Sequence, residues 1–285
     1  PGKDRRFSSD LVGDVIRSFT LTLWNVYSFF VTYANLDKPQ GLTITAATND
    51  LDRWLLSELN VLVRDVTKAY EAYDVLNATR PIEKFVEQLS TWYLRRSRRR
   101  FWKSESDSDK QAAYSTLYTA LTTIAKLLAP AMPFLSEELY QNLVRNVDET
   151  APESVHLAVW PEVMTEFIDE SLNRDMNLVM KLVSLGHSAR QKANRKVRQP
   201  LAAAAFSVGT ATERKALMNN VDIVSDELNV KEVRLLDSAT EAVSHTIKPF
   251  SKQLGQKYGN KFPAIQKAIL SMNAEEVAST FMAGK

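Results

Sequence analysis

The chain has 285 residues, 45% of them hydrophobic, which predicts one large or two ordinary folded domains with a substantial core. It contains no cysteine, which excludes disulfides, thiolate zinc sites and a cysteine nucleophile. The net charge is only +2, from 36 basic and 34 acidic residues, so a surface for nucleic acid has to be a local patch. No apolar signal segment and no run of about 18 apolar residues is present, so we expect a cytoplasmic protein without a membrane span.

The first half of the chain carries apolar residues at spacings of three and four in four long stretches, the pattern of helices that bury one face. The first helix is expected to be capped by Ser8 or Ser9 and to end near Asn35. A loop rich in Thr, Pro and Gly follows, and Asp50 is the expected cap of the second helix.

The third helix is expected to start at Asn77, with Pro81 near its first turn, and to continue to Trp102. The fourth follows a polar break and is interrupted at Pro130 and Pro133 before its apolar stripe resumes. Four such stripes predict a helical bundle.

Around residue 150 the pattern changes to short alternating runs, which predict strands at residues 155–160, 201–208 and 230–236. Helices are expected between them, from about Asp169 to Lys196 and from Thr212 to Asn220, and a last one near Ala264 to Leu270. The chain is therefore predicted to be mainly α, with a helical bundle in residues 1–150, a small α+β domain in 151–244 and a C-terminal appendage in 245–285.

The end of the third helix departs furthest from ordinary globular patterning, because its apolar stripe runs directly into the arginine-rich segment of residues 88–102, QLSTWYLRRSRRRFW. Arginine cannot be buried unpaired, so the helix either outruns its bundle or lines a polar cleft. Guanidinium groups bind phosphate bidentately, and nearby aromatic rings stack on unpaired bases. The alternative is a solvated face, partly neutralised by Glu105, Asp107 and Asp109. The candidate RNA-binding residues here are Arg95, Arg96, Arg98, Arg99, Arg100 and Trp102.

A second basic stretch, in residues 187–201, reads HSARQKANRKVRQPL and contains no acid. Its candidate RNA-binding residues are Arg190, Lys192, Arg195, Lys196 and Arg198. The alternative is a polar helix end that leads into a strand. No glycine-rich phosphate loop is present, and neither His156 nor His187 has a catalytic partner nearby in sequence. We therefore predict no catalytic residue, metal or cofactor in this chain.

Five strings in the chain resemble one known family. They read WNVYSFFVTYAN, LDRWLLSELN, LSTWYLRRSRRRFW, LLAPAMPFLSEELY and LVMKLVSLGHSARQKANRKVRQPL. Together they resemble the C-terminal part of isoleucyl-tRNA synthetase, a class I aminoacyl-tRNA synthetase, over most of residues 5 to 205. The fourth string alone would also fit the valyl and leucyl enzymes.

The resemblance implies that the bundle is an anticodon-binding domain and that the α+β domain is a junction that helps to seat the tRNA. The family's catalytic signatures, HIGH and KMSKS, are missing, as is its editing domain. The chain is thus expected to be a monomeric piece of a longer ligase that binds the anticodon stem-loop of isoleucine tRNA without charging it. ATP and Mg²⁺ would be needed only by the full-length enzyme, and its catalytic and editing domains would be partners within the same chain. The cysteine-ligated zinc module of some family members is not predicted.

Two alternatives stay open at this point. The chain could be the corresponding region of a valyl- or leucyl-tRNA synthetase, or a helical module that binds other proteins.

Overall fold

The computed structural model describes residues 8–44, 49–102, 107–237, 247–274, 277, 278 and 280. The chain divides into two compact units, Pro1–Arg174 and Asp175–Lys285. Helices dominate and the described residues contain two short strands, so the mainly α fold predicted from the sequence is confirmed.

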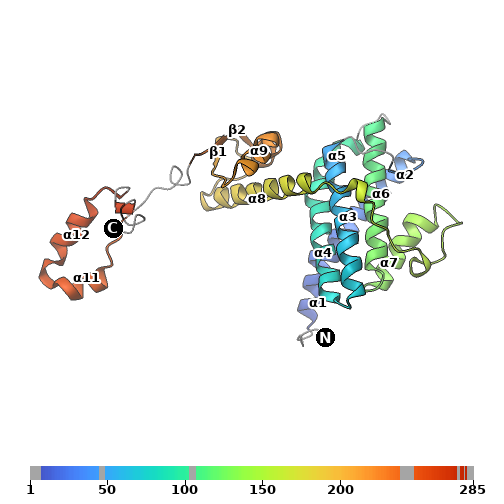
Figure 1. Cartoon of the computed structure of the whole chain (residues 1–285), viewed down its shortest axis with the longest axis horizontal. Coiled ribbons are helices and arrows are strands. Elements are labelled where there is room, and N and C mark those ends of the chain that lie inside the picture. Colours follow the sequence, from blue (N-terminus) through green and yellow to red (C-terminus); the bar gives the residue numbers. More distant parts are fainter. Residues whose placement is uncertain are drawn as a thin grey trace. The chain divides into compact units, whose positions relative to one another are not determined.

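The first unit is a helical bundle in which α3, α4 and α6 run side by side (Figure 1). Short π-helical segments follow α1, α4 and α7, at Ile16–Thr20, Leu89–Leu94 and Gln141–Arg145. The helices are α1 (Ser9–Val15), α2 (Leu21–Asp37), α3 (Asp50–Glu71), α4 (Val75–Gln88), α5 (Arg95–Trp102), α6 (Ser108–Leu128) and α7 (Pro133–Tyr140).

The bundle forms because the apolar stripes read from the sequence meet along its axis. Leu23 of α2, Trp54 of α3 and Leu117 of α6 are completely buried, as is Ile82 of α4. Burial of a side chain of this size contributes roughly 1.5–3 kcal/mol, so the shared core outweighs the weak intrinsic stability of each helix.

The observed N-cap residues of α1 and α3 can be compared with those predicted from the sequence. Ser8 caps α1 as predicted, because its Oγ accepts a hydrogen bond from the Leu11 amide at 3.3 Å. The cap of α3 is Asn49 and not Asp50, since the Asn49 side chain accepts from the Leu51 amide at 2.9 Å.

The third predicted helix also begins earlier than expected. Asp74 accepts from the Asn77 amide at 3.1 Å, so α4 starts at Val75 and Pro81 lies inside the helix instead of in its first turn. Proline has no N–H to donate at this point, which removes one helical hydrogen bond that the surrounding packing has to compensate.

Residues 155–160 are not a strand, contrary to the prediction. They form a 3₁₀ turn at Val155–Leu157 followed by irregular chain that lies along α3. Polar side chains of α3 supply its partners: Thr67 Oγ1 accepts from the Trp160 indole at 2.8 Å, and Asn60 Oδ1 accepts from the Met164 amide at 2.8 Å. The backbone amides that a neighbouring strand would have paired are bonded in another way: the Val155 amide donates to Glu137 Oε2 at 3.0 Å, and the Leu157 and Ala158 amides donate to carbonyls of the turn itself.

The second unit is a small βαβ arrangement. It contains most of α8 (Glu170–Lys192), then β1 (Leu201–Phe206), α9 (Ala211–Asn219), α10 (Val221–Leu228) and β2 (Val230–Leu235). The strands predicted at 201–208 and 230–236 are confirmed, and they pair in parallel, with Leu201 opposite Val230 and Phe206 opposite Leu235. The helix predicted for residues 212–220 continues after a break into α10, because the amphipathic pattern resumes at Val221.

The C-terminal residues form α11 (Ser251–Tyr258) and α12 (Phe262–Leu270), joined by a 3₁₀ turn at Gly259–Lys261. Gly259 has a φ of 50°, a left-handed conformation that glycine adopts without steric cost. The expected last helix is thus present and begins two residues earlier. The domain boundaries predicted at residues 150 and 244 stay predictions, and residue 244 lies outside the described residues.

None of the helices in the described ranges has both the length and the apolar character that crossing a membrane requires.

Candidate nucleic-acid interface

The arginine cluster lies on α5, directly after a π-helical segment that changes which residues face the bundle interior. The π-helical segment Leu89–Leu94 connects α4 to α5, and each π turn adds a residue to the helical repeat. After it, Ser97, Arg100 and Phe101 face the bundle interior, whereas Arg98 and Arg99 are exposed. The arginines of α5 therefore separate into an inner and an outer set.

Arg100 belongs to the inner set and is held by a buried carboxylate. It is only 7% exposed, and its Nη1 and Nη2 donate to the two Asp52 oxygens at 2.7 and 2.6 Å. Nη2 also lies 2.9 Å from Asp109 Oδ1 and donates to the Asp109 carbonyl at 2.9 Å. Asp52, completely buried, accepts a further hydrogen bond from the Tyr93 hydroxyl at 2.7 Å. This bidentate geometry is the strong form of an arginine–carboxylate pair.

The protonation states in this cluster follow from burial and charge. Burial, and then the negative charge of Asp52, raise the pKa of Tyr93 well above its ordinary value, so its hydroxyl stays protonated and donates. Burial alone lowers the pKa of Arg100, but the hydrogen bond and charge of Asp52 outweigh this effect and raise that pKa. Arg100 is thus permanently charged and already bonded, which gives it a structural role in anchoring α5.

The outer set of α5 faces solvent. Arg98 and Arg99 are exposed, and within the described residues their side chains form no hydrogen bond or ion pair. Arg95 donates from Nε to the Thr91 carbonyl at 2.8 Å and lies 6.0 Å from the centre of the Trp92 ring, within reach of a cation–π interaction. Trp102 is 56% exposed, an unusual position for a large aromatic side chain.

We call Arg95, Arg98, Arg99 and Trp102 the α5 basic surface. Arg96, another predicted RNA-binding residue, is half-buried beside this surface. Of the carboxylates expected to neutralise the cluster, Asp109 pairs with the buried Arg100, and Glu105 lies outside the described residues.

In the second unit, Arg190 is also a structural residue. It is 5% exposed, and its guanidinium donates to four backbone carbonyls. Two of these carbonyls, Lys196 and Gln199, belong to the turn after α8, each at 3.0 Å. The other two, Leu228 and Asn229, lie at the C-terminal end of α10, at 2.5 and 3.0 Å, where a cation also complements the helix dipole.

The remaining four cations of the second stretch are exposed on that turn or at the end of α8. We call them the basic turn; they are Lys192, Arg195, Lys196 and Arg198. Within the part of the chain that the structure describes, their side chains form no ion pair. The Asn229 side chain fixes the turn further by donating to the Val197 carbonyl at 3.0 Å. From the sequence alone we predict that the two basic stretches belong to one RNA-binding surface, and this stays a prediction.

Sequence reasoning missed the division between structural and exposed arginines. For Arg100 one signal was present, because it continues the apolar stripe of the third helix, where burial demands a partner. For Arg190 the partners are backbone carbonyls up to 39 residues away, which no local pattern indicates.

Among the described residues, no three His, Cys, Asp or Glu side chains lie together in a way that could hold a metal ion.

The fold and this site define a class: a helical bundle that presents arginines and an aromatic ring at the end of one helix, as nucleic-acid-binding helical domains do. The family described as "Anticodon-binding domain of tRNA ligase" matches residues 52–205, more than half of the chain. The chain belongs to this family.

Three relatives of this chain share one name, isoleucine–tRNA ligase. The chain is 54% identical over 242 residues to the isoleucine–tRNA ligase of Dehalococcoides mccartyi, a match that covers 84% of this chain and 24% of the relative. It is 47% identical to the isoleucine–tRNA ligase of Thermus thermophilus, over 100% of this chain and 28% of the relative. The Deinococcus radiodurans ligase is 43% identical over 100% of this chain and 26% of its own length. The chain thus spans about a quarter of the length of these relatives.

Proposed function

We propose that the chain is the tRNA-binding portion of an isoleucine–tRNA ligase and that it grips the anticodon stem-loop of isoleucine tRNA. The observation that carries this proposal is the division of the α5 arginines. Arg100 is fixed in the bundle by Asp52, and this fixed point holds Arg98 and Arg99 in solvent beside the exposed ring of Trp102.

The chemistry of each side chain determines the part of the RNA that we expect it to contact. Arg95, Arg98 and Arg99 contact phosphates, with Arg96 at their edge, and Trp102 stacks on an unpaired base. Lys192, Arg195, Lys196 and Arg198 contact phosphates from the second unit. Arg100 and Arg190, predicted from the sequence to touch RNA, are left out of the proposal because their donors already bind Asp52 and four carbonyls.

In the whole ligase this portion would act as a monomeric, cytoplasmic positioning device. By holding the anticodon end of the tRNA, it would orient the acceptor end toward catalytic and editing domains elsewhere in the longer protein. ATP and Mg²⁺ would be bound there.

The test is binding of an isoleucine tRNA transcript to the chain across a range of salt, with the double variant Arg98→Gln/Arg99→Gln. Loss of two phosphate contacts should weaken binding and reduce the slope of log K against log salt by about 1.4–1.8. Arg80→Gln/Lys84→Gln is the matched control, because it also removes two charges, from exposed positions of α4 outside the α5 basic surface. Equal losses in both variants would mean that binding depends only on overall charge, which contradicts the proposal.

A further inference from the structure

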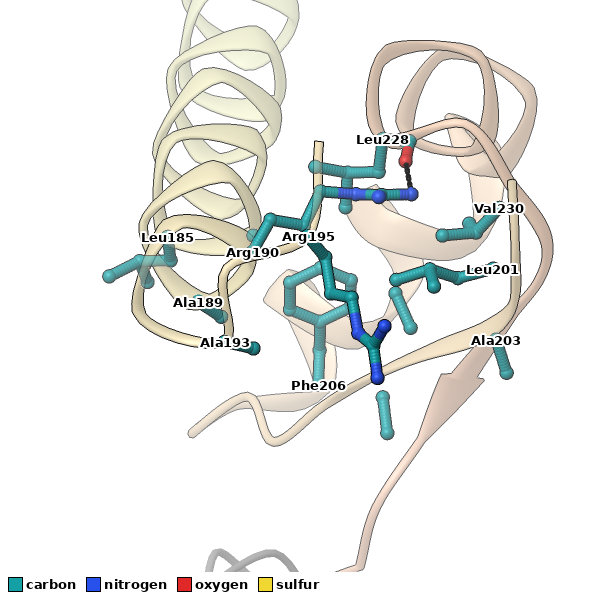
Figure 2. A pocket seen from close by; sticks show the side chains of 13 residues that line it. Leu185, Ala189, Arg190, Ala193, Arg195, Leu201, Ala203, Phe206, Leu228 and Val230 are labelled. Carbon is teal, nitrogen blue, oxygen red and sulfur yellow. Dashed lines mark hydrogen bonds between the residues drawn. The ribbon is translucent and has the colours of Figure 1, made fainter. Parts of the chain in front are cut away.

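The second unit contains a cavity of about 400 Å³ between the C-terminal part of α8 and β1 (Figure 2). Its walls are mainly apolar and include Ala189 and Ala193 of α8 and Leu201 and Phe206 of β1. In the described residues β1 pairs only with β2, and Leu201 and Phe206 are only half-buried. The cavity is therefore an open apolar site of the size that small ligands occupy.

The cavity also carries positive charge. Arg195 of the basic turn belongs to its lining, and in Figure 2 its guanidinium and the Phe206 ring both point into the space between α8 and β1. No carboxylate belongs to the lining among the described residues. Lys192, Lys196 and Arg198 are exposed on the same turn. The site thus combines an apolar interior containing an aromatic ring with a cationic edge.

The site is held in shape before any ligand arrives. Arg190 ties the turn to the end of α10 through the Lys196 and Leu228 carbonyls, at 3.0 and 2.5 Å. The Arg195 amide donates to the Arg190 carbonyl at 2.8 Å, which places Arg195 at the cavity. Such fixed groups bind a ligand with a smaller entropic cost.

We propose that this cavity receives one unpaired base of the bound RNA, with Phe206 stacking on the base and Arg195 binding the adjoining phosphate. This inference rests on the proposed function, because it names a subsite of the same RNA-binding surface. The chemistry matches a nucleotide on both counts: its base has an apolar face that stacks on an aromatic ring, and its phosphate is an anion that arginine binds well. An extended apolar peptide along β1 would fit the walls but would leave the cationic edge without a counter-charge.

The test compares two probes, a short oligouridylate and an abasic ribose-phosphate oligomer of the same length. Both offer phosphates, but only the oligouridylate offers bases. Phe206→Leu removes the aromatic ring, and Ala189→Leu fills the cavity from an exposed position of α8. Ser188→Leu is the matched control, since Ser188 is exposed on α8 and is not part of the lining. Circular dichroism checks that each variant is folded.

We expect the chain to prefer the oligouridylate, and Phe206→Leu to weaken that binding by about 5- to 150-fold. Ala189→Leu should reduce the preference for bases to the part that Trp102 supplies, with salt-dependent binding of both probes, while Ser188→Leu should behave as the unsubstituted chain. Equal binding of both probes by the unsubstituted chain, or an unchanged preference in folded Ala189→Leu, would overturn the inference. If isoleucine tRNA itself still binds, the proposed function survives that result; if tRNA does not bind either, both fail. Binding of an apolar peptide that Ala189→Leu blocks, without RNA binding, would assign the cavity to a protein strand instead.

Discussion

Replacing Asp52 by alanine should be among the most damaging single changes in the first unit. The substitution removes both oxygens that bind Arg100 and the acceptor of the Tyr93 hydroxyl, and it leaves a guanidinium that is 7% exposed without its main counter-charge. Breaking a buried ion pair from one side costs about 3–5 kcal/mol. Since a domain is typically stable by only about 5–15 kcal/mol, this is a large fraction of the total.

The assay is urea unfolding followed by tryptophan fluorescence. All five tryptophans lie in the first unit, so the signal reports that unit alone. With a urea dependence of about 1–3 kcal/mol per molar, Asp52→Ala should lower the midpoint by about 1 M or more. The control is Asp50→Ala, which removes an exposed partner of Arg53 and should cost at most about 1 kcal/mol. If both variants unfold at the same urea concentration, the anchoring role of the Asp52–Arg100 pair is wrong.

Three further outcomes are expected. Arg190→Gln removes charged donors from four carbonyls and should destabilise the second unit by about 2–4 kcal/mol, measured as a lower thermal midpoint by circular dichroism. As a control, Arg198→Gln changes an exposed residue and should stay within about 0.5 kcal/mol of the unsubstituted chain. A larger loss of stability in Arg198→Gln than in Arg190→Gln would contradict the structural role of Arg190. Burial alone raises the pKa of Asp37, but hydrogen bonds from Lys110 and Tyr114 outweigh it and hold that pKa below its ordinary value of 3.8. The resulting stability is present above pH 3.8 and is lost as pH falls below it, so urea unfolding at low pH should show a weaker pH dependence in Asp37→Asn than in the unsubstituted chain, and identical slopes would refute this. Finally, the isolated chain should show no isoleucine-dependent exchange between ATP and pyrophosphate, and robust exchange by a pure sample would refute its assignment as a binding portion.

The bundle was predictable from the sequence because helical periodicity is a local signal. The stripes containing Trp54, Ile82 and Leu117 led directly to α3, α4 and α6, and alternation placed β1 and β2 correctly. The same alternation failed at residues 155–160, where Glu137 of α7 and the carbonyls of a 3₁₀ turn accept hydrogen bonds from the backbone amides. The hydrogen-bond partner of a backbone amide depends on the tertiary structure, and an alternating sequence pattern does not indicate it.

The candidate site was predictable only in outline. Charge clustering located both basic stretches, but it could not separate Arg98 from Arg100, because that difference depends on Asp52, 48 residues away in the chain. It also could not reveal the cavity beside Phe206, which forms only when α8 and β1 come together. The exposure of each arginine and the residues that bind it could therefore be known only from the folded structure.

The most direct test of the central claim is binding of this chain to the anticodon stem-loop of isoleucine tRNA, compared with the same stem carrying a scrambled loop and with a valine stem-loop, across a range of salt. The account predicts binding that weakens as salt rises, because phosphates are neutralised, and that prefers the isoleucine loop, because unpaired bases are read. Salt-insensitive binding, or a preference for the valine loop, would contradict it.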